Sequence, residues 1–279
     1  MRSTPPRLRS VLDRLRRVRG PAVPVRWRPT LLVLLGLVAG WLLTLTVQAF
    51  QRPPLLLGQD AVTTPASRAA RVTLQEDGGH FINIRPASGE AHTLLVFYPG
   101  GRVRPQSYEW LGRALAADGV QTVIPVFPLD LAVLGVNRAD HLIDRYGKRK
   151  RVFLGGHSLG GAMAAQYASK KAGRLDGLLL EAAYPARNVS LQRTNLKVLS
   201  LLAERDGVAR PADVRDGLKR LPPTTTLTTL PGAVHSFFGR YGPQQGDGLP
   251  AVSRAQAEAS ILQAVRAFLK ESAAAQSTP

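Results

Sequence analysis

"VFLGGHSLGGAMAAQY", residues 152–167, is the stretch that decides the fold. A row of apolar residues runs into Gly-Gly-His-Ser-Leu-Gly-Gly and then into a segment of small residues. Packing alone gives no reason for this turn, because glycine inside a strand or helix costs conformational entropy. A sharp turn with tiny neighbours can instead push the hydroxyl of Ser158 out of the fold. The stretch therefore predicts a nucleophilic serine where a buried strand meets a helix.

From about residue 69 onward, strands and helices alternate around this stretch. Residues 70–76 and 79–85 are expected to pair as a hairpin around Asp77-Gly78-Gly79. Fully apolar strands separated by helices indicate a mostly parallel sheet covered on both faces, so the predicted fold class is α/β. Further strands are expected within 92–101, 120–128, 150–156, 175–185, 196–207 and 224–232, and helices within 106–119, 138–147, 162–171, 211–221 and 253–270.

Composition excludes several kinds of site. The 279 residues include no cysteine, which rules out disulfides, thiolate zinc sites and a cysteine nucleophile. The net charge of +18 is unevenly placed, because nine arginines and one aspartate lie within residues 1–29 and give this short segment a charge of +8. The remainder holds no basic run with interleaved aromatic residues, so a nucleic-acid partner is not expected.

One apolar stretch follows the basic front end. Residues 31–50 hold no charged side chain, and as a helix twenty residues rise about 30 Å, enough to cross the hydrocarbon core of a bilayer. The upstream arginines favour a cytoplasmic N-terminus, with the rest of the chain outside the cytoplasm. The predicted organisation is a basic cytoplasmic segment at 1–30, a transmembrane helix at 31–50, a linker at 51–68, a folded α/β domain at 69–272 and a tail at 273–279.

Two fates of the apolar stretch stay open. As an uncleaved anchor, it would make the chain a single-pass protein of the cell membrane. As a secretory signal peptide, it would be removed by a cut after Ala49, where "VQA" has the small-residue pattern of a cleavage site. The basic flank and the apolar core are both long for a signal peptide, so the sequence favours the anchor.

A serine hydroxyl needs a base to take its proton and an acid to orient that base. Of the five histidines, only His235 is expected in a loop just after the last strand, and it is the predicted base. Asp206 follows the preceding strand directly and is the predicted acid, with Glu204 and Asp213 as nearby rivals. The chain order Ser158, Asp206, His235 is the order typical of an α/β sheet that carries such a triad.

The developing oxyanion also needs hydrogen-bond donors. The backbone N–H of Leu159, the residue after the nucleophile, is the first predicted donor. The second is expected from the Pro-Gly-Gly turn that ends the strand in 92–101, where glycines let the backbone approach closely. The N–H of Gly101 is the predicted second donor.

These residues resemble the α/β-hydrolase superfamily, and more closely small bacterial α/β-hydrolase-fold proteins related to dienelactone-hydrolase-like enzymes. The resemblance runs from about residue 90 to 270. It implies Ser158 as nucleophile, Asp206 as acid and His235 as base, with Leu159 and Gly101 as oxyanion donors. Two departures stand out: Pro99-Gly100 replaces the His-Gly of many relatives, and dienelactone hydrolases use cysteine where this chain has Ser158.

The expected function is that of a membrane-anchored serine hydrolase, which cleaves a carboxylic ester or related acyl substrate through an acyl-enzyme. Only about a dozen residues separate the strands in 175–185 and 196–207, which leaves no room for a lid domain. The apolar segment 128–135 and the segment 236–248 are expected to shape the pocket. The alternatives are an acyltransferase on the same triad and a non-catalytic binding protein of this fold. The expected partners are a small-molecule acyl substrate and the membrane, with no metal or organic cofactor.

Overall fold

The computed structural model describes residues 28–50, 52–56 and 70–274. The chain divides into two units, Met1–Gln51 and Arg52–Pro279. Most of the predicted basic segment and linker, and the end of the predicted tail, lie outside the described residues. The boundaries predicted for these parts therefore stay predictions.

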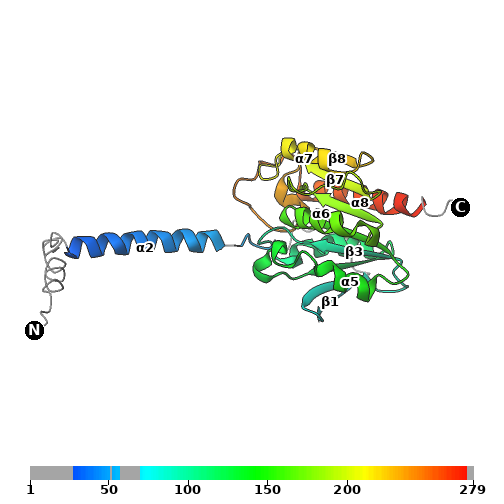
Figure 1. Ribbon diagram of the computed structural model, residues 1–279, viewed down its shortest axis with the longest axis horizontal. Coiled ribbons are helices and arrows are strands. Elements are labelled where there is room, and N and C mark those ends of the chain that lie inside the picture. The colour runs from blue at the N-terminus through cyan, green and yellow to red at the C-terminus, as the bar shows by residue number, and fades with distance from the viewer. Residues whose placement is uncertain (1–27, 51, 57–69, 275–279) are drawn as a thin grey trace, which may run out of the picture. The chain divides into compact units, whose positions relative to one another are not determined.

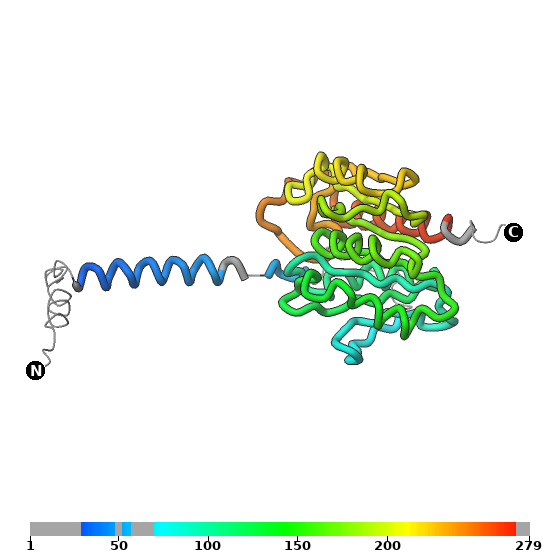
Figure 2. The backbone as a smooth tube through the Cα atoms, viewed as in Figure 1, coloured from blue at the N-terminus to red at the C-terminus, as the bar shows by residue number. Residues whose placement is uncertain are grey.

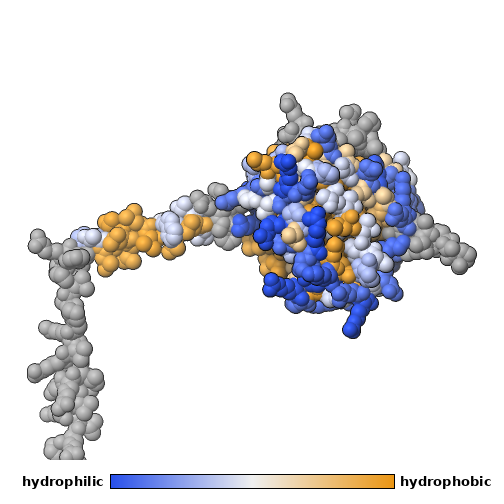
Figure 3. Space-filling view, turned by 90° about the horizontal axis from the view of Figure 1, so that it is seen from above, coloured by the Kyte–Doolittle hydropathy of each residue, from blue (hydrophilic) through white to orange (hydrophobic). Residues whose placement is uncertain are grey.

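The first unit contains one long apolar helix, α2 (Arg28–Phe50). Its segment Pro29–Val47 is long and apolar enough to cross a membrane, by length and composition. Figure 3 shows apolar side chains along the described part of this helix. A helix that exposes leucine and valine on all sides has the composition expected inside a lipid bilayer.

The second unit is built on an eight-stranded sheet in the order β1-β2-β4-β3-β5-β6-β7-β8. The pairs from β4–β3 to β7–β8 are parallel, and β1–β2 and β2–β4 are antiparallel. The strands are β1 (Ala70–Glu76), β2 (His80–Pro86), β3 (Thr93–Tyr98), β4 (Val120–Pro125), β5 (Arg151–His157), β6 (Gly177–Glu181), β7 (Lys197–Ala203) and β8 (Thr226–Leu230).

Helices cover both faces of this sheet. In Figure 1, α5 and α6 lie in front of the strands and α8 lies behind them, on the face that α4 also covers. The helices are α4 (Glu109–Ala116), α5 (Arg138–Tyr146), α6 (Leu159–Lys171), α7 (Pro211–Gly217) and α8 (Arg254–Ala274). Short 3-10 helices that bear on the site are η2 (Pro105–Tyr108), η3 (Pro128–Asp130), η4 (Ala132–Gly135) and η7 (His235–Phe238).

Burial follows the position of each strand. Every residue of β3 and β4 is buried, because helices cover both sides of the sheet centre, whereas the edge strand β1 is only partly covered. The helix α4 turns Trp110, Leu111 and Leu115 toward the core, as the spacing of these residues predicts. The hydrophobic pattern therefore fixes both the central strands and the helix that covers them.

Each strand and helix predicted in the α/β domain is present, including the β1–β2 hairpin. The strand expected within 175–185 is shorter than its apolar run, since it ends at Glu181, where Ala182 takes a positive φ of 45°. Residues 182–196, between β6 and β7, form turns without a helix, so the fold has no lid domain at this point.

Turns that follow the carboxyl ends of the parallel strands gather at one edge of the sheet. Figure 2 shows two of them at the same end of the domain, the green turns after β4 and the orange loop before α8. Ligand sites of open α/β sheets form at this edge, because the strands deliver their loops to it. The residues predicted to carry chemistry belong to these turns.

Candidate active site

The turn between β5 and α6 holds Ser158 in a strained backbone conformation, with φ 52° and ψ −123°. A non-glycine residue with positive φ costs energy and persists only where its surroundings impose it. Those surroundings are backbone here. A Cβ atom on Gly156 would lie 2.6 Å from the carbonyl carbon of Gly160, and one on Gly160 would lie 2.2 Å from the carbonyl oxygen of Tyr98. The turn can therefore form only with glycine at both positions.

The hydroxyl of Ser158 is not used to hold this turn together. The Ser158 side chain does not cap α6, although Ser158 immediately precedes the helix. Its N–H donates to the Glu181 carbonyl over 2.9 Å, and its own carbonyl accepts from Ala162 N–H over 3.0 Å. These bonds fix the main chain and leave Oγ at the amino end of a helix, where partial positive charge favours an anion.

The turn after β3 lies against the start of α6. A Cβ atom on Gly101 would lie 3.0 Å from Leu159 Cδ2, so the two backbone segments are close neighbours. Among the described residues, neither the Gly101 nor the Leu159 N–H donates a hydrogen bond to a protein acceptor. Both predicted oxyanion donors therefore remain available to an acceptor outside the protein.

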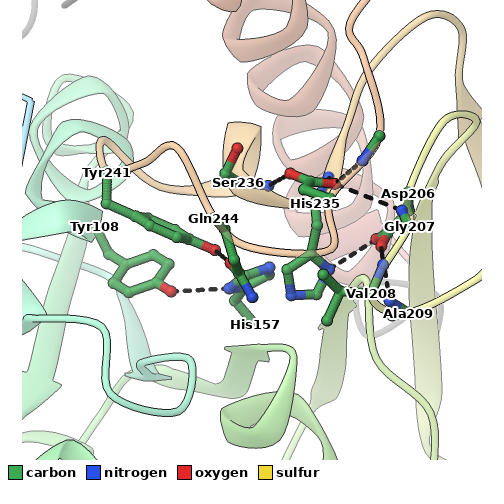
Figure 4. A network of polar contacts seen from close by, with 12 residues as sticks. Tyr108, His157, Asp206, Gly207, Val208, Ala209, His235, Ser236, Tyr241 and Gln244 are labelled. Carbon is green, nitrogen blue, oxygen red and sulfur yellow. Dashed lines mark hydrogen bonds and ion pairs between the residues drawn. The ribbon is translucent and has the colours of Figure 1, made fainter. Parts of the chain in front are cut away.

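His235 begins η7, in the loop that follows β8, and its ring contacts the turn that follows β7. Its Nδ1 lies 2.8 Å from Asp206 Oδ2, and both side chains are almost completely buried. Oδ1 of Asp206 accepts from the N–H groups of Val208 and Ala209, at 2.8 and 2.7 Å (Figure 4). Since Asp206 accepts a hydrogen bond from Nδ1–H, the neutral ring keeps Nε2 as its basic nitrogen.

The two rival acids have other partners. Glu204 Oε2 accepts from Gly232 N–H over 2.7 Å and thereby joins the ends of β7 and β8. Asp213 pairs with Arg210, three residues earlier, near the start of α7. Of the three acids considered, Asp206 is the one that the fold brings to His235.

His235 also lies next to the turn that carries Ser158. Its ring is 4.4 Å, centroid to centroid, from the ring of His157, the residue before the serine. Within the part of the chain that the structure describes, no hydrogen bond joins Ser158 Oγ to His235. Such bonds are often long in ligand-free sites and shorten when substrate binds. The structure thus joins Asp206 to His235 and places Ser158 in the neighbouring turn.

Asp247 is a further member of this arrangement that the sequence did not single out. Its two carboxylate oxygens accept from the N–H groups of His235 and Ser236, both over 2.9 Å. It also accepts from the N–H of Gly248. Asp247 therefore fixes the backbone of η7 at the residue that carries the imidazole. Only a segment, 236–248, was expected to matter, because no short motif marks this aspartate.

A second group of buried side chains lies on the other side of His235. Tyr108 Oη is 2.8 Å from His157 Nδ1 and accepts from Gly100 N–H over 3.0 Å. Burial lowers the pKa of His157 well below its usual range, and the nearby His235 lowers it further, so the His157 ring is neutral. Tyr108 can then donate its single proton to Nδ1, which ties the Gly100 turn to the strand before Ser158.

Glu181 ends β6 directly opposite His157 on the neighbouring strand. Its side chain is fully buried, and neither carboxyl oxygen has a hydrogen-bond partner among the described residues. Burial raises the pKa of this carboxyl well above its usual range, so the acid is held in its neutral form. No sequence pattern marks this group, because the apolar run around it looks like an ordinary buried strand.

The two segments expected to shape a pocket differ in their surroundings. Phe238 is buried and stacks on the His157 ring at 5.4 Å, so it belongs to the core beneath the site. The segment 128–135 forms η3 and η4 and exposes several apolar side chains. In the described parts of the chain, no three His, Asp or Glu side chains are grouped in a way that could hold a metal ion.

Comparison with known proteins agrees with this architecture. A crystal structure of a predicted CIB-like hydrolase from Thermoplasma acidophilum has a TM-score of 0.53 at 14% identity, over 72% of this chain and 100% of that one. At this identity the likeness concerns the fold alone. No curated protein sequence matches the chain. The model of the alpha/beta hydrolase family matches residues 94–259, from β3 into α8, and the chain belongs to that family.

Proposed function

We propose that the protein is a membrane-anchored serine hydrolase that cleaves a carboxylic ester or a related acyl substrate. The observation that carries the proposal is the buried contact of 2.8 Å between His235 Nδ1 and Asp206 Oδ2. It orients an imidazole beside the turn that strains Ser158. A base fixed by an acid next to a strained serine is the arrangement that activates a hydroxyl for acyl transfer.

In the proposed reaction, Ser158 Oγ attacks the carbonyl carbon of the substrate while His235 Nε2 takes the hydroxyl proton. The carbonyl oxygen becomes an oxyanion, which accepts hydrogen bonds from the N–H groups of Leu159 and Gly101. The carbon–oxygen bond to the alcohol then breaks, and the alcohol leaves with the proton from His235. Water, deprotonated by the same imidazole, releases the acid and restores the serine. Each oxyanion donor contributes about 3 to 4 kcal/mol to such a step.

The proposed location rests on α2 and on the basic residues that precede it. A helix of this length and composition crosses a bilayer, and arginines on its amino side favour a cytoplasmic N-terminus. The catalytic unit would then lie outside the cytoplasm, either anchored or released by a cut after Ala49. Comparing the mass of the membrane-bound and released proteins separates these two fates.

A fluorophosphonate probe tests the catalytic proposal, because it reacts covalently with an activated serine. Membranes that express the full chain are labelled as wild type, Ser158→Ala and His235→Ala. We expect the wild type to be labelled and both variants to lose the label. A folded wild type that stays unlabelled would refute the proposal.

Matched substitutions outside the site control for effects on folding. Ser169→Ala removes a hydroxyl that donates to the Gln166 carbonyl within α6, and His80→Ala removes a half-exposed histidine at the start of β2. Both control variants should be labelled like the wild type. Release of alcohol from short-chain esters, with and without added acyl acceptors, then distinguishes hydrolysis from transfer.

A further inference from the structure

The segment after β4 exposes apolar side chains at the rim of the candidate site. Leu129, Val133 and Leu134 are each more than half exposed, at 59%, 51% and 53%. They lie within six residues, on the 3-10 turns η3 and η4. Exposed apolar side chains clustered in this way mark contact with a partner or a membrane, since a water-exposed surface gains nothing from them. We call residues 128–135 the apolar rim loop.

The backbone of the apolar rim loop is held in an unusual conformation. Leu129 and Asp130 both have a φ of 55°, a left-handed conformation that costs energy for residues with a side chain. The Asp130 side chain is turned inward and buried, while Leu129 is exposed. Arg102 N–H donates to the Asp130 carbonyl over 2.8 Å, which fixes the loop next to the predicted oxyanion turn. The exposed side chains are therefore presented by an ordered loop.

A second segment connects this rim to the end of the apolar helix in the chain. Residues 52–56, which we call the docking segment, lie on the domain although they precede its first strand by more than ten residues. Arg52 forms an ion pair with Asp130 of the apolar rim loop, with Nε 2.7 Å from Oδ2. Leu55 pairs with Tyr241 as an antiparallel bridge, and Leu56 N–H donates to the Arg240 carbonyl over 3.1 Å. The docking segment thus contacts two loops that flank the site.

The covalent chain limits how far this rim can lie from a bilayer that contains α2. The apolar segment of α2 ends at Val47, and Arg52 is five residues further on. Even a fully extended chain spans at most about 18 Å over five residues. The exposed side chains of the apolar rim loop belong to the loop that Arg52 binds, so they fall within reach of the same membrane surface.

We propose that the apolar rim loop inserts into the lipid surface on the side where α2 leaves the bilayer, so that the candidate site opens toward the membrane. The inference rests on the proposed membrane anchoring but not on the proposed catalytic chemistry. Leu129, Val133 and Leu134 would enter the boundary between headgroups and acyl chains. Arg104, which is exposed on the neighbouring turn, is placed to meet lipid phosphates there.

Single cysteines test this directly, because the natural chain contains none. Leu134→Cys and Val133→Cys, in the full chain, are labelled with the fluorophore NBD and reconstituted into phosphatidylcholine–phosphatidylglycerol vesicles. The matched control is Gly173→Cys, after the carboxyl end of α6 at the opposite edge of the sheet, where an added Cβ meets no atom within 4 Å. Flotation with the vesicles and protease protection of the N-terminal segment confirm that α2 is inserted.

With α2 inserted, we expect NBD at positions 133 and 134 to emit at shorter wavelength than at position 173. Spin-labelled lipids should quench it at 133 and 134 alone. Emission like that of position 173 would overturn the proposal. So would a blue shift that spin-labelled lipid leaves unquenched, since it would mean that protein covers the loop. Neither readout needs activity, so a folded wild type that the fluorophosphonate probe does not label would refute the proposed chemistry and leave this result standing.

Discussion

Two groups of polar side chains flank the ring of His235, and they are held in opposite ways. On one side, Asp206 and Asp247 accept hydrogen bonds on both of their carboxylate oxygens, most of them from backbone N–H groups. On the other side, His157 is tied to one tyrosine hydroxyl, and the carboxyl group of Glu181 has no hydrogen-bond partner among the described residues.

The difference shows where the site tolerates charge. Carboxylates that accept several N–H bonds can stay ionised when buried, because the donors replace water. Burial instead keeps His157 and Glu181 neutral, since the pKa of the first is lowered and that of the second is raised. The negative charge therefore lies behind the proposed base, and the side chains beneath the predicted oxyanion turn carry none. An oxyanion next to that turn would meet no opposing charge from them.

Removing the acid should have the largest effect on this arrangement. We expect Asp206→Asn to lower the rate of acylation about 10⁴-fold. The amide oxygen would keep accepting from the N–H groups of Val208 and Ala209, so the NH₂ group would face Nδ1 and donate to it, and the imidazole would take the wrong tautomer. Stopped-flow kinetics with an activated ester measure this rate. Asp213→Asn, at the exposed ion pair with Arg210, is the matched control and should change little. Equal rates for the two variants would contradict the assignment of Asp206.

Asp247 should come next, since it holds the backbone of His235 and makes no contact with the imidazole itself. In Asp247→Asn, one oxygen becomes an NH₂ group that faces a backbone N–H. We expect a loss of about 1 to 3 kcal/mol in the free energy of unfolding. A small displacement of the imidazole should also slow acylation by up to about 10². Asp216→Asn, on a half-exposed carboxylate, is the control. An unchanged acylation rate in the Asp247 variant would show that the loop does not position the base.

Tyr108→Phe tests the neutral side of the site. The substitution leaves Gly100 N–H and His157 Nδ1 without the hydroxyl they share, and should cost about 1 to 3 kcal/mol of stability. Tyr98→Phe is a close control, because its hydroxyl also joins two groups, in this case Ala139 N–H and the Val136 carbonyl. Both variants should unfold at lower denaturant concentration, but only Tyr108→Phe should also slow acylation. A rate unchanged in both would limit the Tyr108–His157 pair to a structural role.

Glu181→Gln should change how the stability of the protein depends on pH. Burial raises the pKa of Glu181 well above its ordinary value of 4.5. At pH values between the two, the folded protein keeps a proton on this carboxyl that the unfolded chain has released. The contribution of protonated Glu181 to the free energy of unfolding is therefore fully present below pH 4.5. It is lost as pH rises toward the pKa of the folded state, at up to about 1.4 kcal/mol per pH unit. The variant has no such proton, so its stability relative to wild type should rise with pH. Denaturant titrations between pH 4 and 8 measure this difference, and a constant difference would mean that Glu181 is ionised when folded.

Much of the fold and part of the site could be predicted from local patterns. Apolar runs of strand length and helical spacing predict the strands and helices, and the glycines around Ser158 predict the turn that strains it. The contact between His235 and Asp206 could also be predicted from the sequence, because both residues follow strands whose carboxyl ends lie at one edge of a parallel sheet. Their catalytic roles remain predictions.

The rest depends on contacts between distant parts of the chain. Tyr108 contacts His157, which lies 49 residues further along the sequence. Nothing in the sequence near Tyr108 distinguishes it from other aromatic residues of a core. Glu181 is one acid in an otherwise apolar run. The docking segment was expected to be linker, since "RPPLL" at 52–56 has neither strand nor helix periodicity. Its partners, Asp130 and Tyr241, become visible only when the sheet brings their loops together.

The docking segment also determines where a water-soluble form of the protein should begin. A protein started at residue 69 would match the predicted domain boundary, but it would leave Asp130 without its arginine and the backbone beside Tyr241 without its strand partner. One started at Arg52 keeps both and still omits α2. The first amino acid chosen for expression should therefore decide whether the loops around the site keep the positions they have in the whole chain.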